Sequence, residues 1–291
     1  MKYFIPPVIL RSGKKACSHI RYLKRKFICK NAYKYYAEQY PQKVLFIAGL
    51  PKSGTTWLGN MVCSYPGINN ILIPEITSYE LNNNGSHHYE LPENFPNRFN
   101  AILALMKMHI PGTNHNAQIL QECKVHYVIM YRDLRDVAVS HYFYVKRTPW
   151  HPEFPVYRKL NVEQGLKYFA ENTLEDFEEW IRSWHRNRDP QHSIVVTYEQ
   201  LLGDTVASFT RVAKHFELDS SPETISKIVE ANSFENLSGG RQHGQESSGS
   251  FFRSGTSGNW KNYFTPKVKE LYKQKMGDFL IEFGYEKDKS W

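Results

Sequence analysis

A short apolar run that leads into a glycine-containing turn constrains the fold of this chain most strongly. Val44 to Ala48 are five consecutive apolar residues, and the sequence continues as GLPKSGTTWLGN through Asn60. This pattern predicts a buried strand, a turn and the start of a helix. Such a turn binds phosphate because its backbone N–H groups and the helix N-terminus face the anion. We therefore expect a phosphate-binding loop at Pro51–Trp57.

The spacing of this loop differs from that of ordinary nucleoside triphosphatases. Their Walker A pattern is G-x-x-x-x-G-K-[ST], and Gly49 and Gly54 match its two glycines. Thr55 stands at the position of the Walker lysine, whereas Lys52 lies inside the turn. The displaced lysine favours a phosphate cradle over an ATPase or kinase site. A P-loop kinase or nucleoside triphosphatase stays open as an alternative at this point.

Strand-like and helical patterns alternate along the rest of the chain. We expect strands at 44–48, 71–74, 104–108, 125–131 and 194–197, and helices at 55–64, 134–144, 162–188, 205–216, 222–231 and 267–283. This alternation predicts an α/β fold, with a central parallel sheet flanked by helices on both faces. Ligands bind such sheets at the carboxyl ends of the strands. The expected long loops are 75–100, rich in Asn, His, Pro and Gly, and the Gly/Ser-rich 236–258, a candidate lid.

Positive charge is concentrated at the N-terminus. The formal net charge of the 291 residues is +8, yet residues 1–43 hold eleven Lys or Arg and one acid, which leaves −2 for the remainder. We expect a basic, partly helical arm over 1–43 and a single α/β domain over 44–291. A basic arm suits weak contact with a membrane surface or, as a second alternative, a non-catalytic nucleic-acid-binding protein.

The cysteines and the hydropathy indicate a cytoplasmic protein. The four cysteines lie far apart and lack metal-ligand spacing, which favours reduced thiols and no metal site. The apolar run at Tyr3–Leu10 is too short to span a membrane, so no transmembrane segment is expected.

Three further segments carry reactive side chains after predicted strands. Lys107 and His109 lie two residues apart at the end of one strand, so they share a face, and a histidine there suits proton removal from a hydroxyl or amine. Arg132 follows another strand and suits a phosphate, with Ser140 one helical segment later. Arg253 and two glycines follow the Gly/Ser-rich loop and suit closure over a second phosphate.

Together, these segments resemble the cytosolic-type sulfotransferases that use 3′-phosphoadenosine 5′-phosphosulfate (PAPS) and have a P-loop NTPase-like fold. The resemblance covers about residues 40–285. It is carried by PKSGTTW, by K-x-H-x-P at Lys107–Pro111, by R-D-x-x-D-V-A-V-S at Arg132–Ser140 and by F-R-x-G-x-x-G-x-W-K at Phe252–Lys261.

The resemblance implies a role for each matching residue. The 5′-phosphosulfate would be held by Lys52, Ser53, Gly54, Thr55 and Thr56. The 3′-phosphate would be held by Arg132, Ser140, Arg253 and the Gly255 amide. The adenine would be contacted by Trp57, Tyr198 and the Ser233–Phe234 pair. His109 would be the catalytic base, with Lys107 as its neighbouring lysine, and Lys52 would neutralise the oxygen that bridges sulfate to phosphate.

The resemblance also implies transfer of the sulfuryl group from PAPS to a hydroxyl or amino group of a small molecule, by in-line displacement and without a metal. The product would be PAP, the nucleotide that remains. Residues 75–100, 143–150 and 236–252 are expected to line the acceptor pocket. The chain departs from the family at Ser254, where a lysine is usual, at Asn232, where threonine is frequent, and at Pro266 in the dimer motif. We therefore expect either a monomer or a homodimer.

Overall fold

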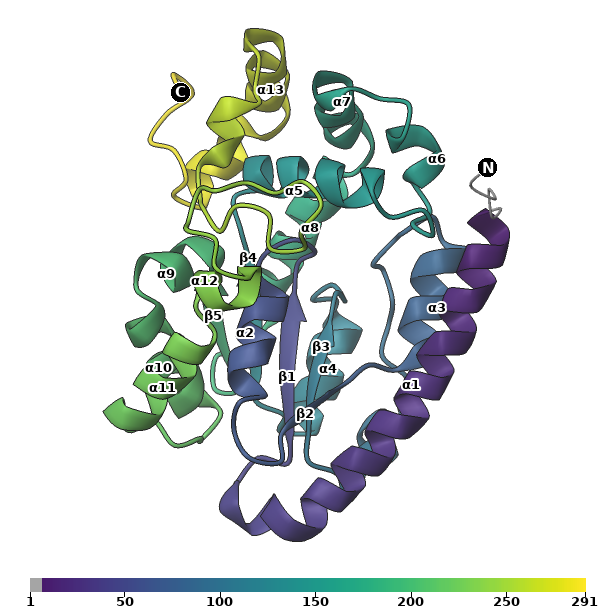
Figure 1. Cartoon of the computed structure of the whole chain (residues 1–291), viewed down its shortest axis with the longest axis vertical. Coiled ribbons are helices and arrows are strands. Elements are labelled where there is room, and N and C mark those ends of the chain that lie inside the picture. The colour runs from purple at the N-terminus through teal and green to yellow at the C-terminus, as the bar shows by residue number, and fades with distance from the viewer. Residues whose placement is uncertain (1–6) are drawn as a thin grey trace.

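Five parallel strands form one sheet in the order β2-β3-β1-β4-β5 (Figure 1). The computed structural model describes residues 7–291. The strands are β1 (Val44–Gly49), β2 (Asn69–Ile71), β3 (Ala104–Met108), β4 (Tyr127–Tyr131) and β5 (Ser193–Thr197). The central strand β1 lies between β3 and β4, so the chain builds the sheet outward on both sides of it. The carboxyl end of β1 is therefore the position where ligands bind in such sheets.

Each face of the sheet has its own hydrophobic core, because successive side chains of a strand point to opposite faces. Leu45 and Ile47 of β1 belong to the core on one face. Phe46 and Ala48 belong to the core on the other. Helices cover both faces (Figure 1), which confirms the predicted fold class.

The helices divide between these two cores. Those of the first core are α2 (Thr55–Val62), α9 (Tyr198–Gly203), α10 (Thr205–His215) and α11 (Pro222–Ala231). Those of the second are α4 (Asn114–Glu122), α5 (Leu134–Lys146), α7 (Val162–Asn172), α8 (Leu174–Asn187) and α13 (Pro266–Glu282). Shorter or peripheral helices are α3 (Pro74–Asn82), α6 (Phe154–Tyr157) and α12 (Phe234–Ser238). Three 3₁₀ turns lie at Ala37–Gln39, Pro96–Phe99 and Asn259–Asn262.

Several predicted boundaries are wrong. The single helix expected over 162–188 is broken at Thr173, where α7 ends and α8 begins with two acidic residues in its first turn. The break lets α7 pack on α5 and α13 while α8 packs on α4. The strand expected at 71–74 ends at Ile71, and Pro74 instead begins α3 inside the expected loop 75–100. The sequence predicts no helix at α4, α6, α9 or α12, yet each of these segments is helical.

The longest helix is α1 (Pro7–Tyr36), which has 30 residues and lies along the outside of the molecule (Figure 1). It packs on α3 and β2. Its Tyr36 ring fits against Gly67, where a Cβ atom would come within 2.6 Å of the ring. Residues 1–6 of the predicted arm lie outside the described residues, and the boundary at residue 43 stays a prediction. None of the described helices combines the length and apolarity needed to cross a membrane.

Candidate functional site

One cavity of about 680 Å³ brings the predicted site residues together at the carboxyl ends of β1, β3 and β4. The predicted residues that line it are Lys52, Gly54, Thr55, Thr56, Trp57, Lys107, His109, Arg132, Ser140, Tyr198, Phe234, Arg253, Ser254 and Gly255. Two others do not line it. Ser53 is fully buried, and Ser233 caps α12 by accepting a hydrogen bond from the Asn236 N–H. Ser233 therefore orients the helix turn that carries Phe234.

The loop between β1 and α2 depends on two residues with positive φ. The φ angles of Lys52 and Gly54 are 65° and 83°. Gly54 is the N-cap of α2, and a Cβ atom there would lie 2.6 Å from the ring of Tyr198. A side chain at position 54 would therefore displace that ring from the cavity wall. The glycine leaves the N-terminus of α2 open to an anion.

Positive charge gathers around this loop. The Lys52 ammonium lies 4.0 Å from the centroid of the Tyr144 ring. Burial, followed by the charges of Arg147 and Lys107, lowers the pKa of Lys52 to about 7. Lys107 donates to the Thr56 hydroxyl (2.9 Å), and burial lowers its pKa as well. A bound anion would favour the charged form of both lysines.

His109 follows β3 directly and turns its ring toward β1. Its Nδ1 lies 2.5 Å from the carbonyl oxygen of Gly49. A carbonyl can only accept, so Nδ1 carries the proton and Nε2 keeps its lone pair. Burial, followed by the charge of His87, lowers the pKa of His109 to about 4. The ring is therefore neutral at pH 7, with Nε2 able to take up a proton.

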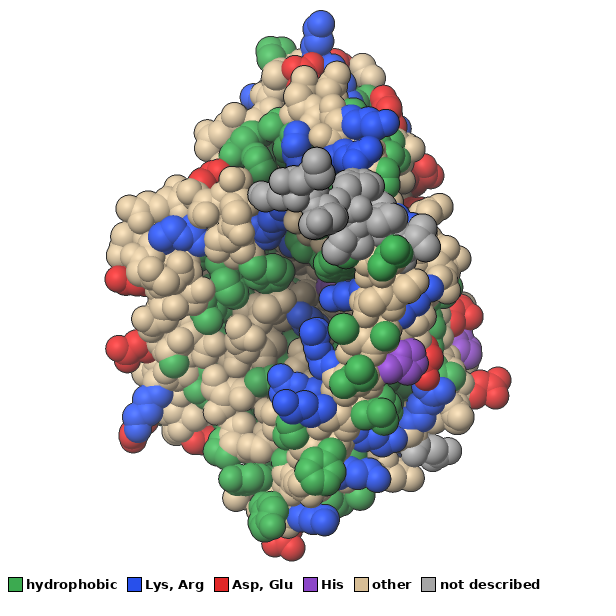
Figure 2. Space-filling model, turned by 45° about the vertical axis from the view of Figure 1, so that its right-hand side comes forward, with side chains coloured by type: hydrophobic (Ala, Val, Ile, Leu, Met, Phe, Trp, Pro, Cys, Tyr) green, Lys and Arg blue, Asp and Glu red, His purple; other side chains and the backbone are tan. Residues whose placement is uncertain are grey.

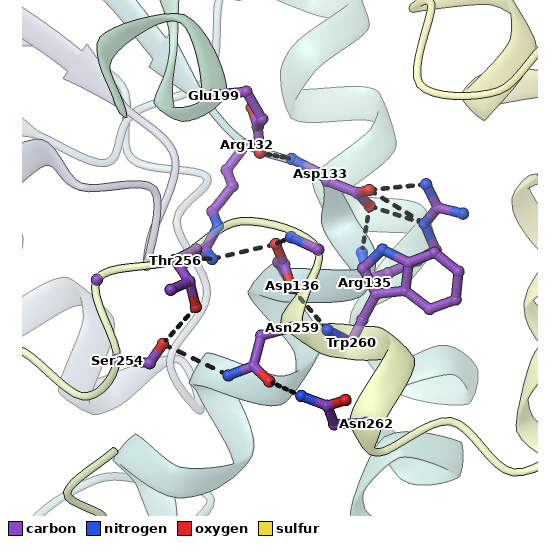
Figure 3. Close-up of polar contacts among 12 residues, drawn as sticks. Arg132, Asp133, Arg135, Asp136, Glu199, Ser254, Thr256, Asn259, Trp260 and Asn262 are labelled. Atoms are coloured by element: carbon purple, nitrogen blue, oxygen red, sulfur yellow. Dashed lines mark hydrogen bonds and ion pairs between the residues drawn. The ribbon is translucent and has the colours of Figure 1, made fainter. Parts of the chain in front are cut away.

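A buried carboxylate joins Arg132 to the segment that follows the long loop (Figure 3). Arg132 donates to the Asp136 carboxylate (3.1 Å) and to the carbonyl of Thr256 (2.7 Å). Asp136 also accepts from the N–H groups of Gly258 (2.7 Å) and Trp260 (2.9 Å). Asp136 thus holds the first turn of α5 against the 253–260 segment and fixes Arg132 at the cavity.

A second buried ion pair, between Asp133 and Arg135, lies at the start of α5 (Figure 3). Asp133 is the N-cap of α5 and accepts from the Arg135 backbone N–H (2.9 Å). The Arg135 guanidinium also binds both oxygens of Asp133, at 3.0 and 2.7 Å. The Asp133 N–H in turn donates to Glu199 (3.1 Å). Both aspartates of the R-D-x-x-D segment therefore form buried ion pairs with arginines, and their role is structural.

Aromatic rings form a separate wall of the cavity. Trp57 donates its indole N–H to the Asn232 carbonyl (2.8 Å). Its ring lies edge-on to that of Tyr198, with 6.2 Å between the ring centroids. Gly255 has a φ of 63°, and a Cβ atom there would lie 2.4 Å from the Phe234 ring. Asn232, which departs from the family pattern, thus still holds Trp57 through its backbone. Only a glycine at 255 lets Phe234 approach this closely.

The long loop folds over the cavity. Arg241 donates to the carbonyl of Arg253 (2.8 Å), and Arg253 pairs with Glu246 (2.8 Å). Phe251 is 51% exposed, and its ring centroid lies 4.9 Å from the Lys52 ammonium. The contacts of Arg241 and Glu246 with Arg253 hold the long loop in place. Phe251 of this loop covers the phosphate-binding loop between β1 and α2. Its movement as a lid stays a prediction.

Imidazoles and a carboxylate line a further part of the cavity, namely Glu80, His87, His141 and His151. His87 Nδ1 lies 3.3 Å from Glu80 Oε1, and its ring lies edge-on to that of His109 at 5.4 Å. Glu80 and His87 belong to the expected acceptor segment 75–100, whereas His141 and His151 lie just outside the expected segment 143–150. Glu80 and His87 place hydrogen-bonding groups near the predicted base. Within residues 7–291, no three or more His, Cys, Asp or Glu are grouped so as to hold a metal ion.

The sequence reasoning missed one wall of the cavity altogether. This wall is a face of α1 made up of Lys14, Cys17, Ser18, Arg21, Tyr22 and Arg25. Intervals of three and four residues place these side chains on one side of the helix. The Lys14 ammonium lies 4.3 Å above the Trp150 ring, which lines the same cavity. The sequence shows this periodicity, but it carries no signal that α1 lies beside the carboxyl ends of the strands.

Two of the buried polar atoms that have no hydrogen-bond partner in the described part of the chain belong to the predicted phosphate-binding residues. They are Ser53 Oγ and Arg132 Nε. Buried polar groups are rarely left unpaired, and these two belong to the loop and to the arginine where phosphate groups are predicted. Gly54 and Gly255 leave space where a side chain would intrude. The residues therefore fit an anionic nucleotide.

The sequence comparisons identify known proteins similar to this chain. The family described as the sulfotransferase domain matches residues 42–280. Sulfotransferase 1 family member D1 of Mus musculus is 28% identical over 288 residues, which cover 86% of this chain and 88% of that protein. A flavonol sulfotransferase-like protein of Flaveria bidentis is 26% identical, with 82% of each chain covered.

Solved structures share the fold. Mouse sulfotransferase SULT7A1 complexed with PAP aligns with a TM-score of 0.61 at 20% identity, covering 83% of this chain and 89% of that one. Retinol dehydratase in complex with androsterone and the inactive cofactor PAP aligns with a TM-score of 0.62 at 20% identity, covering 86% and 85%.

Proposed function

Because this chain belongs to the sulfotransferase family, we propose that it transfers the sulfuryl group of PAPS to a hydroxyl or amino group of a small molecule. The family match agrees with the predicted enzyme class and disfavours a P-loop kinase or a non-catalytic nucleic-acid-binding protein. The observation that carries the proposal is the cationic loop of β1 and α2 facing His109 across one cavity.

The PAPS-binding residues proposed here are those predicted from the sequence. Lys52, Ser53 and the α2 N-terminus would hold the 5′-phosphosulfate, and Ser53 Oγ would gain the partner that it lacks. PAP in the complexes of two proteins with this fold supports the choice of nucleotide. When bound, PAPS would supply the sulfuryl group.

A separate group of residues would hold the 3′-phosphate. Arg132 and Arg253 supply the charge, and Arg132 Nε would gain a partner. Ser140 and the Gly255 amide would complete the pocket. Ser254 replaces the family's usual lysine, but it interacts with the Thr256 hydroxyl (3.1 Å) and therefore stabilises the loop. The adenine would lie against Trp57, Tyr198 and Phe234.

His109 would act as the general base. Its Nδ1 proton is engaged by the Gly49 carbonyl, so Nε2 is the atom that accepts the proton of the acceptor O–H or N–H. As that proton leaves, the acceptor atom forms its bond to sulfur, and the bond between sulfur and the bridging oxygen breaks. A positioned base of this kind contributes about 10²- to 10⁴-fold to the rate.

The lysines would stabilise charge in the transition state. Lys52 would neutralise the bridging oxygen, while Lys107, held by Thr56 at 2.9 Å, would face the sulfuryl oxygens. Fixed charges in a water-poor cavity act strongly because little reorganisation is needed during the reaction. We propose that this catalysis needs no metal.

The acceptor would enter beside His87 and His109. The imidazoles and Glu80 there favour a small molecule with several hydrogen-bonding groups, and Tyr144 and Trp150 offer flat apolar surfaces. The predictions of a cytoplasmic location and of a monomer or homodimer stay open.

The test is incubation of the purified protein with PAPS and panels of phenols, steroids, amines and sugars, followed by mass spectrometry for added sulfate. The expected result is a sulfated product in at least one panel together with PAP formation. ATP consumption with Mg²⁺, without any reaction of PAPS, would instead support the kinase alternative. The His109→Ala variant serves as the control for non-enzymatic transfer.

A further inference from the structure

The outward face of α1 carries an apolar stripe that the protein body does not cover. Ile20, Leu23 and Phe27 are 68%, 66% and 66% exposed. Their spacing of three and four residues places them in one row along the helix. Ile9 lies on the same face near the N-terminus of the helix and is 60% exposed. Figure 2 shows hydrophobic side chains gathered over this helix.

Basic side chains flank this stripe. α1 contains nine Lys or Arg and no Asp or Glu, whereas residues 44–291 carry a formal charge of −2. Of the exposed basic residues of the helix, Lys24, Lys30 and Lys34 lie outside the cavity wall, whereas Arg21 and Arg25 belong to the face that lines it. In Figure 2, Lys and Arg side chains lie on both sides of the hydrophobic ones. The face therefore combines apolar area with an uncompensated positive charge.

The other faces of α1 contact the protein body or line the cavity. One packs on α3 and β2, and another, which includes Lys14, lines the cavity. The buried Cys29 and Ala32 anchor the C-terminal half of the helix. The stripe is thus not needed for folding, and the body holds it in a fixed orientation.

We propose that α1 docks this protein on a membrane surface rich in anionic phospholipid. A helix with Phe and Leu on one face and Lys and Arg beside them lies in the interface between headgroups and acyl chains. Anionic headgroups attract the basic residues, each worth about a fivefold gain in binding near the surface. The occupant is a bilayer and not a second copy, because two copies of α1 would bring their like charges together. Nucleic acid would leave the apolar stripe in water.

Docking would place the cavity close to the membrane surface, because α1 contacts both. The helix that faces the membrane on one side lines the acceptor cavity on the other, so the two are separated by one helix diameter, about 10 Å. Membrane binding needs no sulfuryl transfer, so this proposal can fail while the proposed function holds, and the reverse.

Co-sedimentation of the full chain with vesicles tests the proposal. Vesicles of phosphatidylcholine alone are compared with vesicles in which phosphatidylserine replaces part of it, at low and at physiological salt. We expect binding to the anionic vesicles to be at least tenfold stronger and to weaken with salt. Phe27→Glu should lower that binding by about tenfold or more, because it removes apolar area and adds a negative charge.

A matched control separates the stripe from net charge. Val206 on α10 is 48% exposed, and Val206→Glu introduces the same charge as Phe27→Glu away from α1. We expect it to change vesicle binding by less than about twofold. Equal binding by Phe27→Glu and the wild type, or no preference for phosphatidylserine, would overturn the proposal. So would a dimer that Phe27→Glu converts to a monomer without any vesicle binding.

Discussion

The imidazole of His109 and the carbonyl of Gly49 connect the ends of two neighbouring strands across 2.5 Å. His109 directly follows β3 and Gly49 is the last residue of β1, and the two strands pair in register up to Ala48 and Met108. The sheet itself therefore selects the tautomer of the proposed base. Nε2 is left as the proton acceptor because the backbone occupies Nδ1.

The first prediction concerns this histidine. His109→Ala should lower turnover by about 10²- to 10⁴-fold, the range for loss of a general base. PAP affinity, measured by calorimetry, should stay within about threefold of the wild type, because the nucleotide-binding residues are unchanged. A variant that retains near-normal turnover would remove His109 from the mechanism.

The second prediction concerns the protonation of Lys52. Its pKa is lowered to about 7, first by burial and then by neighbouring cations, so part of the population is neutral at pH 7.5. Binding an anion favours the charged form and raises the pKa, so PAP binding should take up a proton. Affinity should accordingly fall as pH rises from 7 to 9.

Calorimetry in buffers of different ionisation enthalpy measures that proton uptake. The Lys52→Met variant is the control, since it cannot titrate and should show little uptake. Uptake that is unchanged in this variant would assign the proton to another group. Because the pKa of His109 is lowered to about 4, protonation of the base should not limit turnover until the pH falls below about 5.

The third prediction separates steric contact from backbone strain in the 253–260 segment. Gly255 and Gly258 both have positive φ, at 63° and 75°. A Cβ atom at 255 would meet Phe234 at 2.4 Å, whereas one at 258 would meet nothing within 4 Å. Backbone strain should cost each alanine variant about 1 kcal/mol of stability. Only Gly255→Ala should also weaken PAP binding, by about tenfold, because it displaces the ring.

Equilibrium unfolding and calorimetry on the two variants check this prediction. Equal losses of PAP affinity in Gly255→Ala and Gly258→Ala would show that Phe234 does not matter for nucleotide binding.

The fourth prediction concerns Asp136, which is buried with Arg132. Asp136→Ala leaves the guanidinium without its carboxylate and frees two backbone N–H groups. Loss of one partner of a buried pair should lower the free energy of unfolding by about 3 kcal/mol. Lys227→Ala, which breaks the exposed pair with Glu223, should change it by less than about 1 kcal/mol. Denaturant unfolding distinguishes the two, and equal effects would contradict a structural role for Asp136.

The sequence predicted the fold where the signal is local. The apolar run of β1 and the glycines after it determine a strand and a loop within a few residues, so their positions could be predicted. The Asn- and Gly-rich composition downstream of Pro74 predicts a loop, although Pro74 begins α3. The sequence carries no signal of a break at Thr173, since helical periodicity continues on both sides of it.

The site residues divide in the same way. Lys52, His109 and Arg132 follow strands, so parallel topology alone predicts that they meet. The wall formed by α1 depends on contacts between residues far apart in the chain, such as Lys14 and Trp150. Periodicity shows which residues share a face of that helix, but not what the face contacts.

The proposed function requires that the cavity bind a nucleotide with phosphates at both the 5′ and the 3′ position. Calorimetric titration with PAP and with AMP, which lacks the 3′-phosphate, tests it most directly. We predict that PAP binds at least about 100-fold more tightly than AMP, since two or more charge-assisted hydrogen bonds from Arg132 and Arg253 are at stake. Arg253→Ala should remove most of that difference. Equal affinities for PAP and AMP, or a preference for ATP with Mg²⁺ over PAP, would show that Arg132 and Arg253 do not form a 3′-phosphate site.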